Sequence, residues 1–168
     1  MNNFVRRGAA AAILAAAFAA PPAFAADEGS SLQVNATVTA NCSVSTSAVA
    51  FGDVDVTSGQ AVPGTGSVSV TCTNGTAWTA AADAGAGSGA DLATRKLANG
   101  ANLLNYSLFT DSARTQLWGD GIEGATALFS DTGTGTAQTK TVYGLVAGGQ
   151  TGAPAGEYAD TVQVTVSY

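Results

Sequence analysis

The sequence contains no histidine and only two cysteines, and both shortages limit the chemistry that the protein can perform. Without histidine there is no imidazole base for a serine or cysteine triad and no imidazole ligand for a metal. Cys42 and Cys72 lack the CxxC spacing of zinc motifs. We therefore predict that the protein is not an enzyme, and we expect no metal site and no cofactor.

Cations are also scarce, with six lysines and arginines against twelve aspartates and glutamates. An acidic protein repels phosphate backbones, so nucleic acid is not an expected partner.

Two of the six cations, Arg6 and Arg7, precede an apolar run from Ala9 to Ala20 and the small-residue ending Ala23-Phe24-Ala25. A positive start, a short apolar stretch and an A-x-A ending are typical of a secretory signal peptide. We predict that residues 1–25 are this signal peptide. A membrane anchor is the alternative, although the run is shorter than the roughly 20 residues that a membrane span needs.

Removal of residues 1–25 leaves one domain with four cations and twelve acids, a net charge of −8. It contains no second apolar segment long enough for a membrane helix, so we expect no membrane contact in the mature form. In an exported chain, Cys42 and Cys72 are expected to form a disulfide, which would stabilise the fold by about 3–4 kcal/mol. A reactive or metal-binding cysteine pair is the alternative.

The mature chain is rich in Gly, Ala, Ser, Thr and Val, which favours strands and turns over helices. Turns are predicted at Asn74-Gly75, Asn99-Gly100 and the Gly- and Pro-rich stretch Gly59–Gly66. Only Asp91–Ala98 is a candidate for a single helical turn. Runs of alternating apolar and polar residues predict strands at Ser67–Thr73, Leu103–Phe109, Thr139–Val146 and Asp160–Tyr168, with a further short strand near Val49–Phe51. Many short strands of this kind predict an all-β sandwich.

The segment Ser31–Asn41 also alternates, but no turn signal folds it back on a neighbour. Its apolar face consists of Leu32, Val34, Ala36 and Val38. This face must be buried, either within the protein's own sandwich or elsewhere.

Other candidate sites give weaker signals. Asp53 and Asp55 share a face if they lie on a strand, so they either contact a cation or, as we expect, are solvated loop acids. Trp78, Trp118 and Tyr106 either form a sugar-binding platform or belong to the core, and we expect the core.

The order and spacing of several segments resemble the Spore Coat Protein U domain family, which includes the major subunits of archaic chaperone–usher pili. The resemblance extends from Leu32 to Tyr168. Besides the alternating segment before Cys42, it rests on VTCT at Val70–Thr73, LLNYSLFTDSARTQLWGDG at Leu103–Gly121, YGLVAGGQ at Tyr143–Gln150 and GEYADTVQVTVSY at Gly156–Tyr168.

The resemblance implies an incomplete immunoglobulin-like β-sandwich that lacks its final strand and has an N-terminal donor-strand extension. A periplasmic chaperone first lends the missing strand. At an outer-membrane usher, the N-terminal segment of the neighbouring pilin subunit then replaces it, and the resulting pilus serves attachment and biofilm formation.

On this basis residues 26–41 are the donor segment, with contacts from Leu32, Val34, Ala36 and Val38, and residues 42–168 are the pilin domain. Val162, Val164, Val166 and Tyr168 form the wall of the acceptor groove. The protein would pass through the periplasm to the cell surface. Two alternatives are a self-complete secreted sandwich that binds carbohydrate through exposed Trp78 and Trp118, and a spore or cell coat protein.

Overall fold

The computed structural model describes residues 24–123 and 126–168, so nearly all of the predicted signal peptide lies outside the described residues. No helix in the described ranges has the length and apolarity needed to cross a membrane. The residues of these two ranges form eight strands: β1 (Cys42–Ala50), β2 (Val62–Cys72), β3 (Ala77–Ala82), β4 (Arg95–Asn99), β5 (Asn102–Phe109), β6 (Phe129–Thr132), β7 (Gln138–Val146) and β8 (Val164–Ser167).

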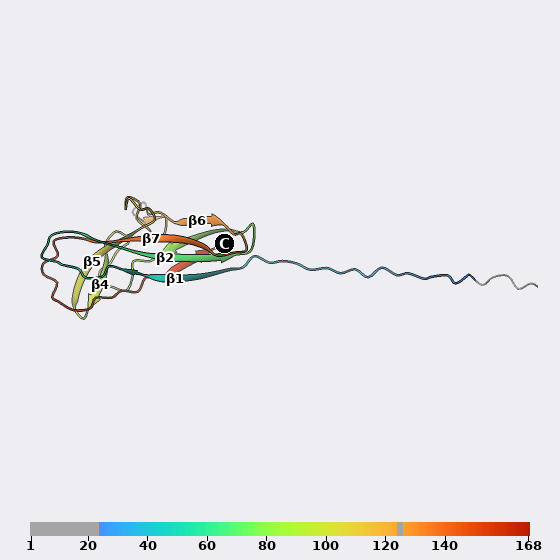
Figure 1. Ribbon diagram of the computed structural model, residues 1–168, viewed down its shortest axis with the longest axis horizontal. Helices are drawn as coiled ribbons and strands as arrows, with labels where there is room; N and C mark the ends of the chain where they lie inside the picture. The colour runs from blue at the N-terminus through green and yellow to red at the C-terminus, as the bar shows by residue number, and fades with distance from the viewer. Residues whose placement is uncertain (1–23, 124–125) are drawn as a thin grey trace, which may run out of the picture. The chain divides into compact units, whose positions relative to one another are not determined.

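The strands make two sheets that pack as an immunoglobulin-like sandwich (Figure 1). The larger sheet has the order β1-β2-β7-β5-β4, and the smaller has the order β6-β3-β8. All pairings between these strands are antiparallel. The turn between β4 and β5 joins Asn99 to its register partner Asn102 and places Gly100 at φ 59°, where glycine carries no steric penalty. This confirms the turn predicted there.

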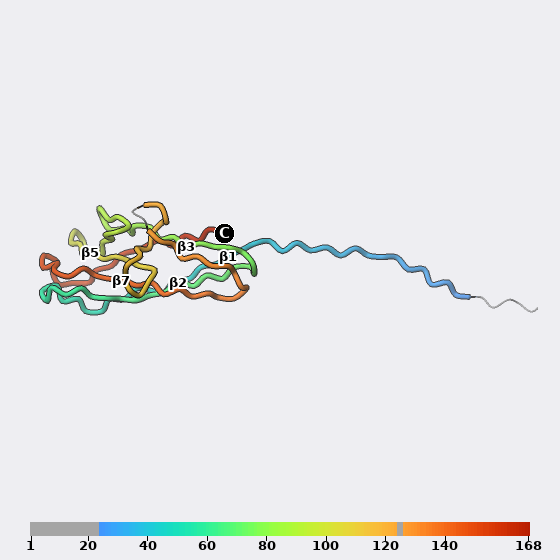
Figure 2. The backbone as a smooth tube through the Cα atoms, turned by 90° about the horizontal axis from the view of Figure 1, so that it is seen from above, coloured from blue at the N-terminus to red at the C-terminus, as the bar shows by residue number. Residues whose placement is uncertain are grey.

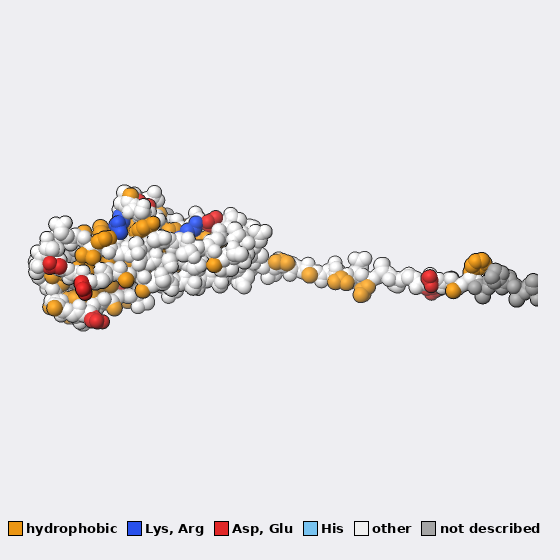
Figure 3. Space-filling model, in the orientation of Figure 1, with side chains coloured by type: hydrophobic (Ala, Val, Ile, Leu, Met, Phe, Trp, Pro, Cys, Tyr) orange, Lys and Arg blue, Asp and Glu red, His pale blue; other side chains and the backbone are white. Residues whose placement is uncertain are grey.

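Alternation along the strands separates core from surface. In β2, Val68, Val70 and Cys72 are buried, whereas the intervening Ser67, Ser69 and Thr71 face outward. Over β1 and β2 the visible surface is accordingly polar and almost uncharged (Figure 3). The other strands contribute alternate residues to the same core, namely Trp78, Ala80, Ala82, Leu104, Tyr106, Leu108, Val142 and Val146, joined by Trp118 and Phe129.

A β-bulge redirects the end of β1 into the core. Between Ser47 and Ala50 the register against β2 shifts, which turns Val49 toward the inner face of the larger sheet. Val49 and Phe51 then lie over Gly144, because a Cβ placed there would come within 2.7 Å of Val49 and 2.8 Å of Phe51. The glycine in β7 is therefore required by close packing.

Several strands differ from the sequence-based expectations. Asp91–Ala98 is not a helical turn, because Arg95–Asn99 pairs with β5 as β4. The predicted turn Gly59–Gly66 is also partly wrong, since β2 begins at Val62 and includes Pro63. β3 and β6 were not predicted. Pairing with neighbouring strands decides the conformation of β3, β4 and β6, and local composition does not reveal it.

Residues 24–41 form no strand. Leu32 is 86% exposed, and Val34 and Val38 are each 83% exposed.

The close packing at Gly144 gives a stability prediction. Gly144→Ala should lower the free energy of unfolding by about 1–3 kcal/mol, because the added methyl group meets Val49 and Phe51. Gly152→Ala is the matched control, since a Cβ there meets nothing within 4 Å and should change stability by less than about 0.5 kcal/mol. Urea unfolding of both variants measures the difference, and equal stabilities would contradict the packing described here.

Candidate functional site

A groove lies between β1 and the C-terminal segment that leads into β8. It encloses a cavity of about 290 Å³. Its floor is made of core residues, including Val68, Leu108 and Val142, so the cavity reaches the hydrophobic core. The rim consists of Thr46, Ser47, Ala48, Val49 and Phe51 on one side and Asp160, Thr161, Val162 and Val164 on the other.

Among the described residues, β8 pairs only with β3 and so forms one edge of the smaller sheet. Figure 2 shows the C-terminal end of the chain beside β3. The Asp83 amide donates to the Gln163 carbonyl, at 3.1 Å, whereas the Ala82 amide bonds away from β8, to Gly119. Because hydrogen-bonding direction alternates along an antiparallel strand, the backbone groups of Val164 and Val166 point away from β3. The edge beside the groove thus presents backbone donors and acceptors that an added strand can pair with.

The four residues predicted to form the groove wall occupy different positions. Val162 and Val164 line the cavity. Val166 is partly buried against the core. Tyr168 is 60% exposed and is not among the lining residues.

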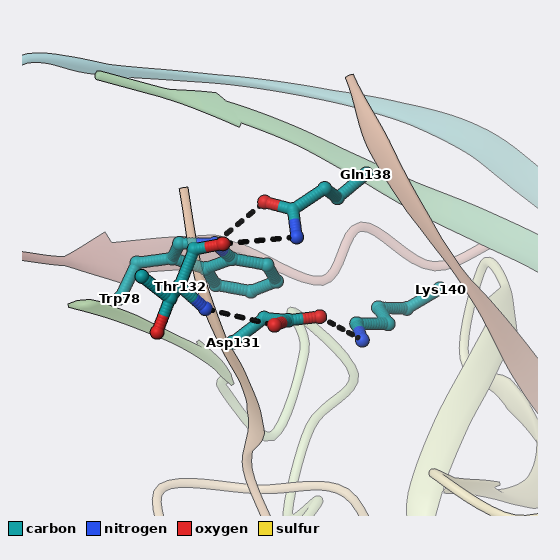
Figure 4. A network of polar contacts seen from close by, with 5 residues as sticks. All are labelled: Trp78, Asp131, Thr132, Gln138 and Lys140. Carbon is teal, nitrogen blue, oxygen red and sulfur yellow. Dashed lines mark hydrogen bonds and ion pairs between the residues drawn. The ribbon is translucent and has the colours of Figure 1, made fainter. Parts of the chain in front are cut away.

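The opposite side of the sandwich, where β6 and β7 meet, is closed by polar contacts (Figure 4). Gln138 of β7 accepts a hydrogen bond from the Trp78 indole at 3.2 Å and donates to the Thr132 carbonyl at 3.1 Å. Lys140 of β7 pairs with Asp131 of β6 at 2.8 Å, which lowers the pKa of the Asp131 carboxyl. These contacts join the two sheets on this side.

One end of the groove is polar. The Tyr106 hydroxyl donates to Asp160 Oδ2 at 2.7 Å, and Asp160 Oδ1 accepts the Ala86 and Thr161 amides at 2.8 Å each. Burial, reinforced by the hydrogen bond to Asp160, raises the pKa of the Tyr106 phenol, so it remains a donor. These bonds hold the C-terminal segment in place before β8 begins.

Arg95 is fully buried close to this polar end. Its guanidinium donates to three carbonyls, those of Asp83 at 2.9 Å, Leu92 at 3.0 Å and Trp118 at 2.7 Å. Desolvation lowers the pKa of Arg95, while the neighbouring Tyr106, Asp83 and Asp160 act in the opposite direction. The side chain thus ties together the loops that surround the groove wall.

The start of the domain is fastened at the disulfide. Cys42 and Cys72 are bonded and are register partners on β1 and β2, with Cα atoms 4.1 Å apart, which confirms the predicted pairing. Next to them, the Thr73 amide donates to the Asn41 carbonyl at 2.9 Å, and the Asn41 amide donates to Thr73 Oγ1 at 3.1 Å. Thr73 and the disulfide thereby fix the point from which residues before Asn41 leave the domain.

The other candidate sites are structural. Trp78 and Trp118 are each 2% exposed, which confirms their core position and removes them as an exposed sugar platform. Asp55 accepts the Thr57 amide and hydroxyl, and Asp120 accepts the Ile122 and Glu123 amides, so both carboxylates stabilise turns. Among the described residues, no group of three or more potential metal ligands occurs.

Sequence reasoning missed the contribution of Phe51, Tyr106 and Asp160 to the groove. Tyr106 was assigned only to the core, and Asp160 only to the start of a strand. The apolar residue at every second position from Val162 onward did indicate which side of this segment faces inward. No local pattern, however, indicates that a tyrosine in β5 meets an aspartate 54 residues later.

Comparisons with known proteins agree with this geometry. A model of the Spore Coat Protein U domain matches residues 29–165. No curated protein matches the chain. Among solved structures, it is similar to a chain in the crystal structure of the CsuC–CsuE chaperone–tip adhesion subunit pre-assembly complex from archaic chaperone–usher Csu pili of Acinetobacter baumannii.

That similarity has a TM-score of 0.58 at 22% sequence identity and covers 79% of this chain. It covers 40% of the length of the other chain. The likeness therefore concerns the fold.

The bond between Tyr106 and Asp160 can be tested through stability. Tyr106→Phe should lower the free energy of unfolding by about 1–3 kcal/mol, because it removes a hydrogen bond to a charged group and leaves a partly buried carboxylate less well paired. Tyr168→Phe is the control, because Tyr168 is 60% exposed. Chemical denaturation compares the two, and a Tyr106→Phe variant as stable as Tyr168→Phe would contradict this role.

Proposed function

The chain belongs to the Spore Coat Protein U domain family, and we propose that it is a structural subunit of a secreted adhesive pilus. Subunits assemble by donor-strand complementation, in which the N-terminal segment of one copy completes the sandwich of the next. The protein acts as a building block, not as an enzyme, and its fibre serves attachment and biofilm formation at the cell surface.

The observation that carries this proposal is the open groove beside β8. Its rim includes the free edge of the smaller sheet and its floor is made of core residues, as expected of a sandwich that lacks one strand. Adding a strand satisfies the backbone groups of the edge and at the same time fills the apolar floor.

The segment before Cys42 has the properties of the missing strand. Its apolar residues fall at every second position from Leu32 to Val38, as they do from Val162 to Val166 along the groove wall. Leu32, Val34 and Val38 are almost fully exposed. Burial of each would contribute about 1.5–3 kcal/mol, and the smaller Ala36 would contribute less.

A contact of this kind is heterologous, because the donor surface and the acceptor surface differ. Repetition therefore builds a filament and does not close a dimer. The open groove also needs protection before assembly, which a periplasmic chaperone would provide by lending a strand. An outer-membrane usher would then exchange that strand for the next subunit.

Export agrees with the sequence pattern of residues 1–25, predicted to be a secretory signal peptide. The printed description of the similar structure names a chaperone and a tip adhesion subunit of archaic chaperone–usher pili. By analogy, this chain would meet such a chaperone in the periplasm. A spore or cell coat protein, which the family name suggests, is the second candidate, and neighbouring genes for a chaperone and an usher would favour the pilus.

Donor-strand assembly can be tested with two complementary variants. Leu32→Asp places a carboxylate on the apolar face of the donor segment, and Val164→Asp places one in the groove. Each variant alone should remain monomeric in size-exclusion chromatography, because burying an unpaired charge is strongly unfavourable. Mixed together, they should form a complex that stops at two subunits, since only one intact donor and one intact groove remain.

Matched controls carry the same charge on the opposite faces. Gln33→Asp alters the polar face of the donor segment, and Thr165→Asp alters an exposed residue of β8. Both should assemble like the unmodified chain. Assembly of Leu32→Asp into long fibres, or its failure to pair with Val164→Asp while both remain folded, would contradict the proposal.

A further inference from the structure

Among the side chains that line the groove, one is charged. The lining consists of aliphatic, aromatic, hydroxyl-bearing and small residues, apart from Asp160. This aspartate lies two residues before Val162 and four before Val164, so on an extended segment all three side chains project to the same side. Asp160 therefore continues the inward-facing row and gives it a negatively charged end.

The contacts of Asp160 fix its carboxylate in place. Oδ1 accepts the Ala86 and Thr161 amides, and Oδ2 accepts the Tyr106 hydroxyl. A carboxylate offers about four acceptor positions, so three hydrogen bonds leave it able to accept one more. The nearest loop gives it little room to move, because a Cβ at Gly85 would overlap the carboxylate.

Arg95 does not neutralise this carboxylate by direct contact. Its three nitrogens donate to the carbonyls of Asp83, Leu92 and Trp118, and the one ion pair found among the described residues joins Lys140 to Asp131. The Asp160 carboxylate is therefore in no ion pair among the described residues, and a strand in the groove would meet it directly.

We propose that Asp160 is a specificity-determining residue of the groove, which selects the occupying strand by the charge at one of its ends. A strand that places a hydrogen-bond donor or a cation beside Asp160 is favoured, and a strand that places a carboxylate there is disfavoured. This inference rests on the proposed function, because it assumes that the groove receives a strand, namely residues 26–41 of a second copy.

The charge distribution of residues 26–41 is compatible with selection by charge at Asp160. Asp27 and Glu28 are its only charged residues, and none occurs from Gly29 to Asn41. If Leu32–Val38 lies beside Val162–Tyr168, the residue that meets Asp160 is Ser30 in one strand direction and Ala40 in the other, since each lies two positions beyond the apolar row. Both are small and neutral, so neither direction places a carboxylate directly beside Asp160.

Selection by charge can be tested with synthetic peptides of residues 26–41. The acceptor is the full chain carrying Leu32→Asp and Val34→Asp, whose groove cannot be filled by its own altered segment. Four peptide variants, Ser30→Lys, Ser30→Glu, Ala40→Lys and Ala40→Glu, are compared with the unmodified peptide by fluorescence anisotropy. At one of the two positions, Lys should tighten binding and Glu should weaken it by about two- to fivefold at low salt.

Asp160→Asn in the acceptor should abolish this difference. Asp53→Asn should preserve it, although it changes the net charge of the protein by the same amount. Equal responses at both peptide ends would indicate attraction to the acidic protein as a whole and would overturn the inference, as would a response that persists in Asp160→Asn.

If Asp160→Asn fails to fold, the peptide measurements on the acceptor that retains Asp160 still test the inference. Binding of the unmodified peptide with no effect of charge at either end would overturn the role of Asp160 and leave the proposed function intact. Absence of any peptide binding would overturn the proposed function and this inference together.

Discussion

The unpaired edge of β8 is the constraint on which the rest of the structure depends. One edge of this strand bonds to β3, while the other faces a groove floored by Val68, Leu108 and Val142. At this place, a strand edge whose backbone groups are free to pair with another strand borders a cavity lined by apolar core residues. Under the proposed function, a single added strand would pair with this edge and fill the cavity.

The two sides of the sandwich are held together by different contacts. Where β6 and β7 meet, Gln138 and Lys140 bridge to the smaller sheet. On the side with the groove, the C-terminal segment is held by its pairing with β3, by backbone hydrogen bonds between Ala159 and Ala98 of β4, and by side chains. The Tyr106 hydroxyl donates to Asp160 of this segment, and Asp83 accepts the Gln163 amide. Arg95 in turn donates to the Asp83 carbonyl. These contacts thus hold the groove wall in place within the single chain.

Much of the fold follows from local alternation. The inward rows Val68–Cys72 and Leu104–Leu108 were predicted because period-two patterns place alternate side chains on opposite faces of a strand. β3 was missed because its run of alanines around Trp78 carries little hydrophobic contrast, and β4 because Asp91–Ala98 has no strand pattern. β3 becomes a strand through pairing with β6 and β8, which are distant in sequence and leave no trace in it. β4 becomes a strand through pairing with β5 across the turn at Asn99-Gly100.

From the sequence come the inward face of most strands, the expectation that Cys42 and Cys72 pair, and the apolar row of Leu32–Val38 with no local partner. These are properties of residue type and spacing. Only the packing of the sheets shows that β1 and the segment leading into β8 leave a groove between them, and that Asp160 lies at one end of this groove bonded to Tyr106. The physical reason is that a groove is formed by elements far apart in the chain, so its shape and charge depend on how the sheets pack.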